Sequence, residues 1–235
     1  TPKPSSAASD VYKRQEFPHL QFGTNANEFK LNTFQILEMI NKTSHAISND
    51  ETRLFLSGIY LQEIDGKLRA VATDGFRLAL VETELSNNKI EALINGIIIP
   101  KKGVAELKKI AEAYPDHQIG ISVDESFIYL NANNTYLLAI RLIAKEYLKY
   151  QAIIPKKTNN HADIDKNSFL NAVRRIKIMA NERSNGVKLI MKEGEMTVAA
   201  NHPSLGDAFE KFPINYSGKE FELSLIHISE PTRPL

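Results

Sequence analysis

The sequence predicts an α+β protein built from repeated units in which helices pack on antiparallel sheet. Helical stripes alternate along the chain with pairs of short strand patterns joined by glycine-containing turns. One hairpin pattern recurs: SGIYLQEIDGKLRAVATD at 57–74 aligns without a gap on NGVKLIMKEGEMTVAANH at 185–202, which places Gly58 on Gly186 and Gly66 on Gly194. A duplication explains this match, and chance similarity between two amphipathic hairpins is the alternative.

The first unit begins with a helix followed by that hairpin. Phe34, Leu37 and Ile40 share one helical stripe after a candidate N-cap at Asn32. In residues 57–74 both arms alternate apolar with other residues around a glycine turn, which predicts two strands with a buried face.

A second helix and further strands complete this unit. The run IIIPKKGVAELKKIAEAY at 97–114 predicts an apolar strand and then a helix whose stripe consists of Val104, Leu107, Ile110, Ala111 and Tyr114. At about 100° per residue, the four lysines of this run fall on the opposite face. Residues 119–126 and 127–143 then predict two or three more strands.

A second, incomplete unit follows the polar segment IIPKKTNNHAD at 153–163. Its helix is predicted from the stripe formed by Phe169, Val173, Ile176 and Ala180 after a cap at Asp165. The recurring hairpin at 185–202 comes next. We therefore expect a complete unit over 28–157 and a partial one over 158–222.

The two ends of the chain do not read as natural protein. The run DVYKRQ at 10–15 can be encoded by GATGTGTATAAGAGACAG, and the reverse complement of that DNA translates as LSLIHI, residues 223–228. One DNA element read on opposite strands accounts for both, and it looks like the transposon adapters used to prepare sequencing libraries. We expect 1–15 and 223–235 to be adapter-derived tails and 16–222 to be an internal fragment of a longer protein.

Composition and charge exclude several classes of function. The chain has no cysteine, which rules out disulfides, thiolate metal sites and a cysteine nucleophile. No apolar run approaches the roughly 20 residues that a membrane span needs. Without the expected tails, 25 of the 29 basic and 26 of the 28 acidic residues remain, a net charge of −1. Any electrostatic function must therefore come from the placement of charge.

Six motifs together carry a family resemblance: LFLSGIYLQ, VATDGFRLA, IIIPKKGVAELKKI, SNGVKLIM, MTVAAN and INYSGKEFEL. In this order they resemble the bacterial DNA polymerase III β subunit family, the sliding clamps, and the resemblance covers residues 16–222. It implies a DNA clamp fold containing the end of a first domain (16–27), the whole middle domain (28–157) and roughly half of a third (158–222).

The resemblance also implies a function. Members of the family are processivity factors of DNA replication: head-to-tail homodimeric rings of six similar domains, with helices lining the hole around duplex DNA. They tether the replicative DNA polymerase, the clamp loader and repair proteins through short linear peptides. Because neither surface of the ring interface would be complete here, we expect this fragment to be monomeric.

The run TDGFRL at 73–78 supports two interpretations. The pattern alone indicates a strand-end turn, in which Gly75 supplies a positive φ and Arg77 is a solvated neighbour. The resemblance implies one wall of a hydrophobic peptide-binding groove, with expected groove residues Leu56, Thr73, Gly75, Phe76, Arg77, Leu78, Leu148 and Ile153. Phe76 stands where the family frequently has His. YLKY at 147–150 stands where a Phe-Pro-Asp-Tyr type sequence is frequent, so Leu148 lacks the rigidity of a proline.

The lysine-bearing helix also supports two interpretations. A lysine face opposite an apolar stripe is typical of a solvated helix surface. The resemblance implies that such faces meet the DNA backbone without reading sequence, and the expected DNA-facing residues are Lys101, Lys102, Lys108, Lys109, Arg174, Arg175 and Lys177.

Two other classes of function remain as alternatives. An enzyme could be imagined from Asp74, Arg77 and one histidine, but the sequence has no metal-ligand spacing, G-x-S-x-G motif or phosphate-binding glycine loop, and His45 and His202 suit surface or loop positions. A peptide-binding interaction module unrelated to DNA would keep the groove without needing the lysine faces. We expect no enzymatic activity, no cofactor, no metal, no membrane partner and a cytoplasmic, nucleoid-associated location.

Overall fold

The computed structural model describes residues 28–50, 52–85, 90–158, 160–180 and 186–225. The chain divides into two compact units, Thr1–Leu148 and Lys149–Leu235, and each is described by itself. The expected tail 1–15, the expected end of a first domain at 16–27 and residues 226–235 lie outside the described residues. The sequence places the boundary after Lys157, several residues beyond this division.

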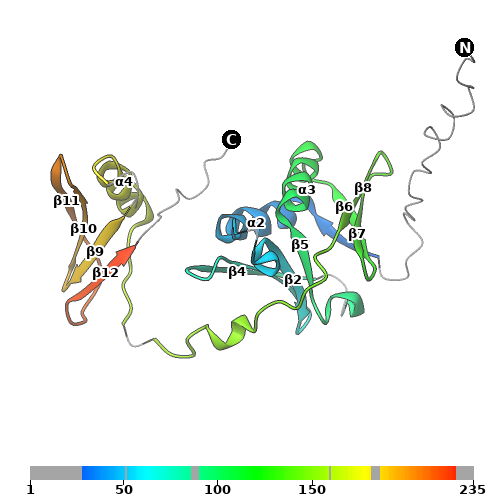
Figure 1. Ribbon diagram of the computed structural model, residues 1–235, viewed down its shortest axis with the longest axis horizontal. Helices are drawn as coiled ribbons and strands as arrows, with labels where there is room; N and C mark the ends of the chain where they lie inside the picture. The colour runs from blue at the N-terminus through cyan, green and yellow to red at the C-terminus, as the bar shows by residue number, and fades with distance from the viewer. Residues whose placement is uncertain (1–27, 51, 86–89, 159, 181–185, 226–235) are drawn as a thin grey trace, which may run out of the picture. The chain divides into compact units, whose positions relative to one another are not determined.

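Unit 1 consists of two halves with the same order of elements (Figure 1). The first half runs β1 (Phe29–Asn32), α2 (Thr33–Thr43), β2 (Gly58–Ile64), β3 (Lys67–Thr73) and β4 (Leu78–Glu84). The second runs β5 (Ile97–Pro100), α3 (Lys101–Ala113), β6 (Gln118–Val123), β7 (Phe127–Ala132) and β8 (Tyr136–Arg141). Short 3-10 turns lie at Ser44–Ala46, Leu54–Leu56 and Glu91–Leu93.

Each half gives its first strand to the sheet of the other. The two sheets have the orders β4-β3-β2-β5 and β1-β6-β7-β8, and every pairing is antiparallel. Phe29 of β1 pairs with Ile121 of β6, and Ile99 of β5 pairs with Ile59 of β2. Because of this exchange neither half of unit 1 has a complete sheet of its own.

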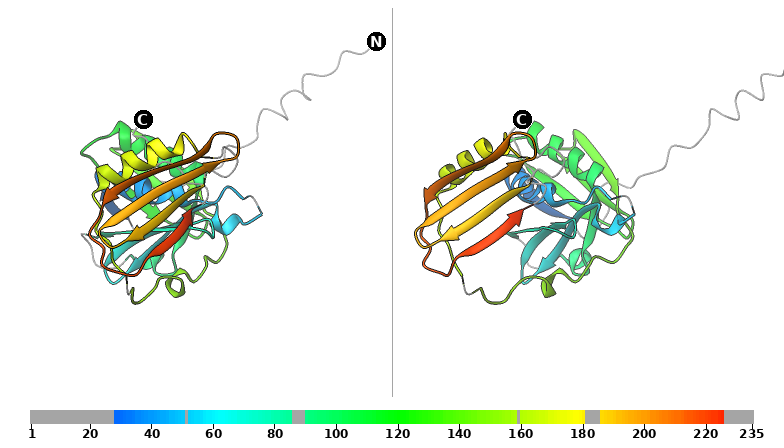
Figure 2. Two further views of the ribbon diagram at one scale, coloured as in Figure 1. Left: turned by 90° about the vertical axis from the view of Figure 1, so that its left-hand side faces the viewer. Right: turned by 60° about the vertical axis from the view of Figure 1, so that its left-hand side comes forward.

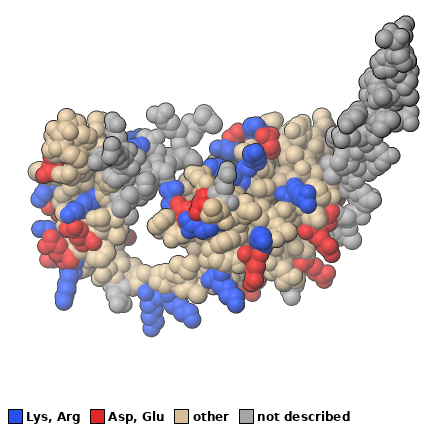
Figure 3. Space-filling model, viewed as in Figure 1, with Lys and Arg blue, Asp and Glu red and all other residues tan. Residues whose placement is uncertain are grey.

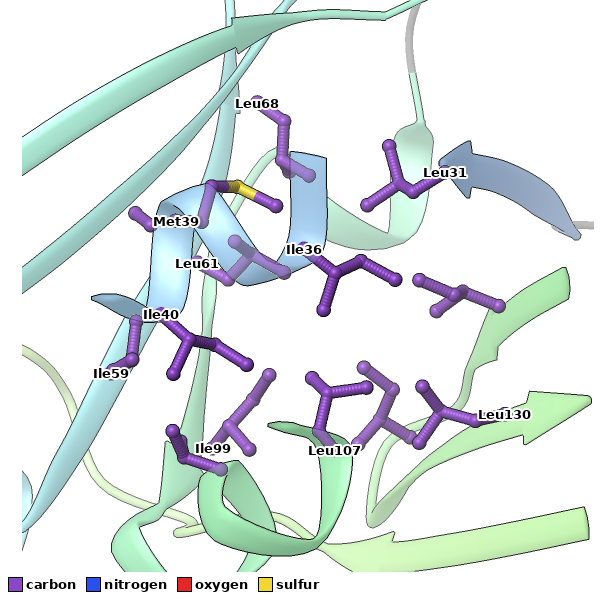
Figure 4. Close-up of a cluster of buried hydrophobic side chains, with 14 of the residues drawn as sticks. Leu31, Ile36, Met39, Ile40, Ile59, Leu61, Leu68, Ile99, Leu107 and Leu130 are labelled. Atoms are coloured by element: carbon purple, nitrogen blue, oxygen red, sulfur yellow. The ribbon is translucent and has the colours of Figure 1, made fainter. Parts of the chain in front are cut away.

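The core of unit 1 lies between the two helices and the two sheets. Figure 4 shows Ile36, Met39 and Ile40 of α2 and Leu107 of α3 among side chains from several strands. All four are less than 10% exposed, so α2 and α3 bury one apolar stripe each against the sheets and against each other.

The stripe predicted for the first helix is partly wrong. Ile40 is buried, but Phe34 is 70% exposed and Leu37 is only half-buried. The buried positions are Thr33, Ile36, Met39, Ile40 and Thr43, which follow the same helical spacing on a neighbouring face. Both choices satisfy the period, so the sequence pattern could not decide between them. The start of the helix is as expected, since the Gln35 side chain accepts a hydrogen bond from the Asn32 amide at 3.1 Å.

The stripe predicted for α3 is confirmed. Val104, Leu107, Ile110 and Ala111 are buried and Tyr114, just beyond the helix, is half-buried. Three of the four lysines on the opposite face are exposed, and Lys108 is half-buried. The three strands after the helix are β6, β7 and β8.

Unit 2 is a four-stranded antiparallel sheet with one helix across it. After a 3-10 turn at Tyr150–Ala152 its elements are α4 (Lys166–Lys177), β9 (Val187–Lys192), β10 (Glu195–His202), β11 (Gly206–Pro213) and β12 (Phe221–Leu225). Figure 2 shows the strands side by side in the order β11-β10-β9-β12, with α4 on one face.

The start of α4 is set by a local cap. The Asp165 carboxylate accepts hydrogen bonds from the amide of Ser168 at 2.8 Å and from its hydroxyl at 2.7 Å. Ile176 is buried, and Phe169 and Val173 pack partly buried on the same core. The sequence extends the stripe to Ala180, which is buried, but the helix ends at Lys177.

The recurring hairpin is confirmed as a structural repeat in the same register. Ile64 pairs with Lys67 across the first turn, and their counterparts 128 residues later, Lys192 and Glu195, pair across the second. Gly66 and Gly194 both have a positive φ, of 78° and 73°. Glycine is the residue that adopts this conformation without strain, which explains why it marks both turns.

The repeat extends to the fourth strand. Ile97 of β5 pairs with Leu61, and Leu223 of β12 pairs with Leu189, the counterpart of Leu61. Strand β12 therefore takes the place of β5. It runs through 223–225, the beginning of the segment that the sequence predicts to be adapter-derived, and pairs there with β9.

The longest described helix, α3, has 13 residues, and no helix in the described ranges is long and apolar enough to cross a bilayer.

Candidate peptide-binding loop and DNA-facing helices

The loop between β3 and β4 is held by the Asp74 side chain. Its Oδ1 accepts hydrogen bonds from the amides of Phe76 at 3.0 Å and Arg77 at 3.1 Å, and its Oδ2 accepts one from Arg77 Nε at 3.1 Å. The Thr73 hydroxyl donates to the Arg77 carbonyl at 2.6 Å, and Gly75 has a φ of 94°. This closed turn leaves the Phe76 side chain 92% exposed.

The electrostatics of the loop keep Asp74 ionised. Burial favours the neutral acid, but the two amide hydrogen bonds and the Arg77 guanidinium outweigh it, so the pKa of Asp74 lies below its usual value. Arg77 is therefore an ion-paired and half-buried residue, in contrast to the solvated neighbour that the turn pattern alone indicates.

A second acidic turn lies next to this loop. Asp50 accepts hydrogen bonds from the Thr52 amide and hydroxyl at 2.9 and 2.6 Å and from Arg53 Nε at 2.7 Å. Hydrogen bonds from Thr52 and Arg53 lower the pKa of Asp50 to about 2. A Cβ placed on Gly75 would lie 3.2 Å from Arg53 Nη1, so Arg53 borders the loop.

The corresponding loop of unit 2 uses a different side chain in the same role. The repeat places His202 at the position of Asp74, and His202 Nδ1 accepts hydrogen bonds from the amides of Ser204 and Leu205, each at 3.2 Å. Both loops are thus closed by a side chain that accepts from the amides two and three residues later. Only the loop of unit 1 adds an arginine to its cap.

The eight expected groove residues differ in exposure. Phe76 and Ile153 are 92% and 62% exposed, Gly75 is exposed, and Arg77, Leu78 and Leu148 are half-buried. Leu56 and Thr73 are buried within unit 1, at 3% and 4%. The structure brings Thr73, Gly75, Phe76, Arg77 and Leu78 together in one turn; Leu148 ends unit 1 and Ile153 belongs to unit 2.

The seven expected DNA-facing residues divide by their partners. Lys109 pairs with Glu106 at 2.8 Å, Lys108 with Glu112 at 3.8 Å, and Arg175 of α4 with Glu210 of β11. Lys101 Nζ donates to Asn49 Oδ1 at 2.6 Å, and Lys177 is half-buried. Lys102 and Arg174 are exposed and have no ion pair with any described residue. Figure 3 likewise shows basic side chains beside acidic ones on the face it presents.

Sequence reasoning missed the residues that surround these cations. The pairs Glu106–Lys109 and Lys108–Glu112 have the spacing of helical ion pairs and could have been read from the sequence. Glu210 could not, because it lies on a strand 35 residues after Arg175. Sequence reasoning also missed Arg53, which borders the loop at 73–78. The one local sign of it was the Asp-x-Thr-Arg run before Leu54, which is typical of a capped turn. In the described ranges no three His, Asp or Glu side chains gather to hold a metal ion.

The fold and these two surfaces define a protein of repeated α+β units with cationic helices and a polar-capped loop, and comparisons with known proteins identify its family. The model of the DNA polymerase III beta subunit, central domain, matches residues 30–149, and that of the C-terminal domain matches 151–227. The chain belongs to the DNA polymerase III beta subunit family, so both the resemblance and the clamp fold expected from the sequence are confirmed.

Individual relatives agree. The chain is 30% identical over 212 residues to the beta sliding clamp of Chlamydia trachomatis, covering 90% of this chain and 50% of that protein. The Escherichia coli beta sliding clamp is 26% identical over 208 residues, 88% of this chain and 56% of that one. The chain thus spans about half the length of the curated relatives it matches.

Solved structures show the same fold. The sliding clamp of Bartonella birtlesii, solved bound to griselimycin, is similar with a TM-score of 0.80 and 29% identity over 90% of this chain and 57% of that one. The DNA polymerase III subunit beta of Pseudomonas aeruginosa has a TM-score of 0.80 and 25% identity over the same shares.

Proposed function

We propose that this chain is part of a sliding clamp, a non-enzymatic processivity factor that encircles duplex DNA and tethers the replicative polymerase. The observations that carry the proposal are the in-register repeat of a helix and hairpin in both units and the exposed cations on α3 of unit 1 and α4 of unit 2. Cations on helices contact phosphates without reading bases, as sliding requires.

The proposed DNA-facing residues are those expected from the sequence: Lys101, Lys102, Lys108, Lys109, Arg174, Arg175 and Lys177. Lys102 and Arg174 are the most available, because they are exposed and no described carboxylate pairs with them. Lys101 has a second role in unit 1, since its hydrogen bond to Asn49 joins the start of α3 to the segment beside the capped loop.

The proposed peptide-binding surface is centred on the loop at 73–78 of unit 1, and the family resemblance adds the buried Leu56, Leu148 at the end of unit 1 and Ile153 of unit 2. Its partners would be short linear peptides of the replicative polymerase, the clamp loader and repair proteins. The Asp74 cap fixes the backbone of the loop, so that Phe76 offers an exposed ring and Arg77 a positioned guanidinium. A pre-formed turn lowers the entropic cost of binding.

The longer protein is proposed to act as a homodimeric ring in the cytoplasm, at the nucleoid. A peptide-binding module unrelated to DNA is the second candidate. It would need the capped loop but not the exposed cations, so DNA association separates the two.

The test is the binding of this chain to a fluorescent 20-base-pair duplex, measured by anisotropy at several salt concentrations. We expect weak binding, on the order of 10⁻⁴ M near physiological salt and tighter at low salt, with no dependence on DNA sequence. Replacing both Lys102 and Arg174 with Glu should reduce the affinity most at low salt. A chain without salt-dependent duplex binding would favour the peptide-binding module.

A further inference from the structure

Three of the proposed DNA-facing cations are held by carboxylates. Lys109 and Lys108 pair with Glu106 and Glu112 on the same helix, three and four residues away. In unit 2, Arg175 of α4 makes a two-pronged contact with Glu210 of β11, in which Nε and Nη2 each donate to one carboxylate oxygen. The carboxylates thus come from a helix in one unit and from a strand in the other.

Two of these ion pairs are open to solvent and can exchange partners, and in the third Lys108 is 26% and Glu112 52% exposed. The Lys109 and Arg175 side chains are 68% and 60% exposed, and their partners Glu106 and Glu210 are 46% and 29% exposed. Hydrogen bonds to the carboxylates raise the pKa values of Lys109 and Arg175, so both cations stay charged. An exposed pair of this kind contributes little to stability, since water competes for both charges.

We propose that Glu106, Glu112 and Glu210 compete with DNA phosphates for Lys109, Lys108 and Arg175, and thereby set how strongly the helix faces hold duplex DNA. This inference rests on the proposed DNA-facing role of α3 and α4. A phosphate that approaches one of these cations competes with its carboxylate for the charge and the N–H donors, and the carboxylate also repels the DNA.

The consequence is a graded surface. Lys102 and Arg174 can contact phosphates without competition from a carboxylate. The three paired cations contribute less to DNA affinity, because their carboxylates compete with the phosphates. A face on which every cation were free would bind the backbone more tightly and release more counterions per contact. The carboxylates are thus positioning residues that keep the association weak enough for movement along the duplex.

The experiment uses the same duplex-binding measurement on the chain carrying Glu106→Gln, Glu112→Gln and Glu210→Gln. Glutamine keeps the size of the side chain and removes its charge. Each released cation should strengthen binding by about 1.5- to 5-fold, the range expected for an exposed ion pair. Each new phosphate contact should also steepen the slope of log K against log salt by about 0.9.

The matched control removes three charges elsewhere: Glu91→Gln, Glu125→Gln and Glu193→Gln. These glutamates are exposed, lie outside α2, α3 and α4, and make no ion pair with a described residue. The control changes net charge equally, so it should strengthen binding slightly without adding a phosphate contact. Thermal melts of both triple variants establish that they are folded.

The outcomes separate the inference from the proposed function. A steeper salt slope in the first triple variant than in the control supports the inference. Equal slopes overturn it, while the DNA-facing role stands if replacing Lys102 and Arg174 with Glu weakens binding. If the unaltered chain shows no salt-dependent binding, the proposed DNA role is overturned and the inference with it.

Discussion

At the scale of single residues, two carboxylates organise the surface around the proposed peptide site. Asp74 closes the loop that presents Phe76 and Arg77, and Asp50 closes the turn that carries Arg53. Each aspartate accepts hydrogen bonds both from backbone amides of its turn and from an arginine side chain. Each therefore orders the backbone of the turn and positions a guanidinium. The surface that a peptide would meet is therefore ordered before it binds.

Arg77→Ala should weaken peptide binding to this chain. Short peptides with a glutamine and a Leu-Phe type apolar end are expected to bind with a Kd on the order of 10–100 μM or poorer. Loss of a charge-assisted hydrogen bond should weaken them about tenfold or more. The loop should persist, because the amides of Phe76 and residue 77 still donate to Asp74. Calorimetric titration is the measurement.

Arg141→Ala is the matched control for this prediction, because Arg141 is an exposed arginine at the end of β8. Its removal should leave peptide affinity unchanged. Equal affinities of the Arg77→Ala chain and the unaltered chain would remove Arg77 from the proposed groove.

Asp50 gives a prediction about pH. Its pKa of about 2 in the folded chain lies below the value of about 4 for an unfolded aspartate, so the folded state binds this proton less readily. The contribution of the turn is therefore complete above about pH 4 and is lost as the pH falls toward 2. The amide proton of Thr52 should titrate in NMR spectra with a midpoint near 2. In Asp50→Asn this titration should disappear, and a midpoint near 4 in the unaltered chain would contradict the assigned hydrogen bonds.

At the scale of elements, the hairpin turns are where sequence and structure correspond most directly. The Asp65-Gly66 pair predicts a two-residue turn because both positions need a positive φ, and they have values of 55° and 78°. The partner of Gly66 in the repeat, Gly194, has the same conformation. The spacing between strands and glycine thus determines the register of both hairpins.

Replacing either glycine tests this correspondence. A Cβ at Gly66 or Gly194 would meet no atom within 4 Å, so the effect of Gly66→Ala or Gly194→Ala comes from the backbone conformation alone. Each should lower the free energy of unfolding of its unit by about 1–2 kcal/mol. Asparagine, which tolerates a positive φ, should cost less. Chemical denaturation measures both, and an Asn variant no better than Ala would show that conformation is not the cause.

The exchange of β1 and β5 between the halves of unit 1 could not be predicted in the same way. Each of these strands has four residues, and its partner lies far along the chain: Leu31 pairs with Ile119, and Ile97 with Leu61. Short-range patterns carry no information about such partners. The buried face of α2 could not be predicted for the same reason. Whether Phe34 is exposed depends on which face of the helix the sheets cover.

In the candidate sites too, features set by local sequence were predictable and features set by packing between distant segments were not. The lysine face of α3 was predictable, since helical period alone separates lysines from the buried stripe. Within the TDGFRL loop, the cap by Asp74 follows from the local preference of aspartate for amides two and three residues later. The approach of Arg53 to Gly75 and of Glu210 to Arg175 depends on how elements pack. The sequence therefore predicted the exposed lysines of α3 and the capped loop, and the structure supplied the charged residues that pair with or border them.

At the scale of the whole molecule, the two units differ in how completely their sheets are covered. In unit 1, β5 is followed by α3, and Ile97, the counterpart of Leu223, is half-buried and packs against the core. In unit 2, β12 takes the place of β5, but Phe221 and Leu223 are 43% and 39% exposed. The helix α4 packs on that sheet against β9, β10 and β11. A sheet that buries less apolar surface gains less hydrophobic free energy to offset the conformational entropy that its chain loses on folding.

We therefore expect unit 2 to unfold before unit 1 and to have an unfolding free energy below about 5 kcal/mol. Calorimetry should show two transitions.

Leu68→Ala and Met196→Ala, equivalent buried positions in the repeat, should each destabilise only their own unit, by about 2–5 kcal/mol. Limited proteolysis with mass spectrometry should leave a core that ends between Leu148 and Lys157, which also locates the boundary between the units, and sedimentation should report a monomer. One cooperative transition lowered by both substitutions, or a protected C-terminal third in a stable dimer, would show that the units are not independent.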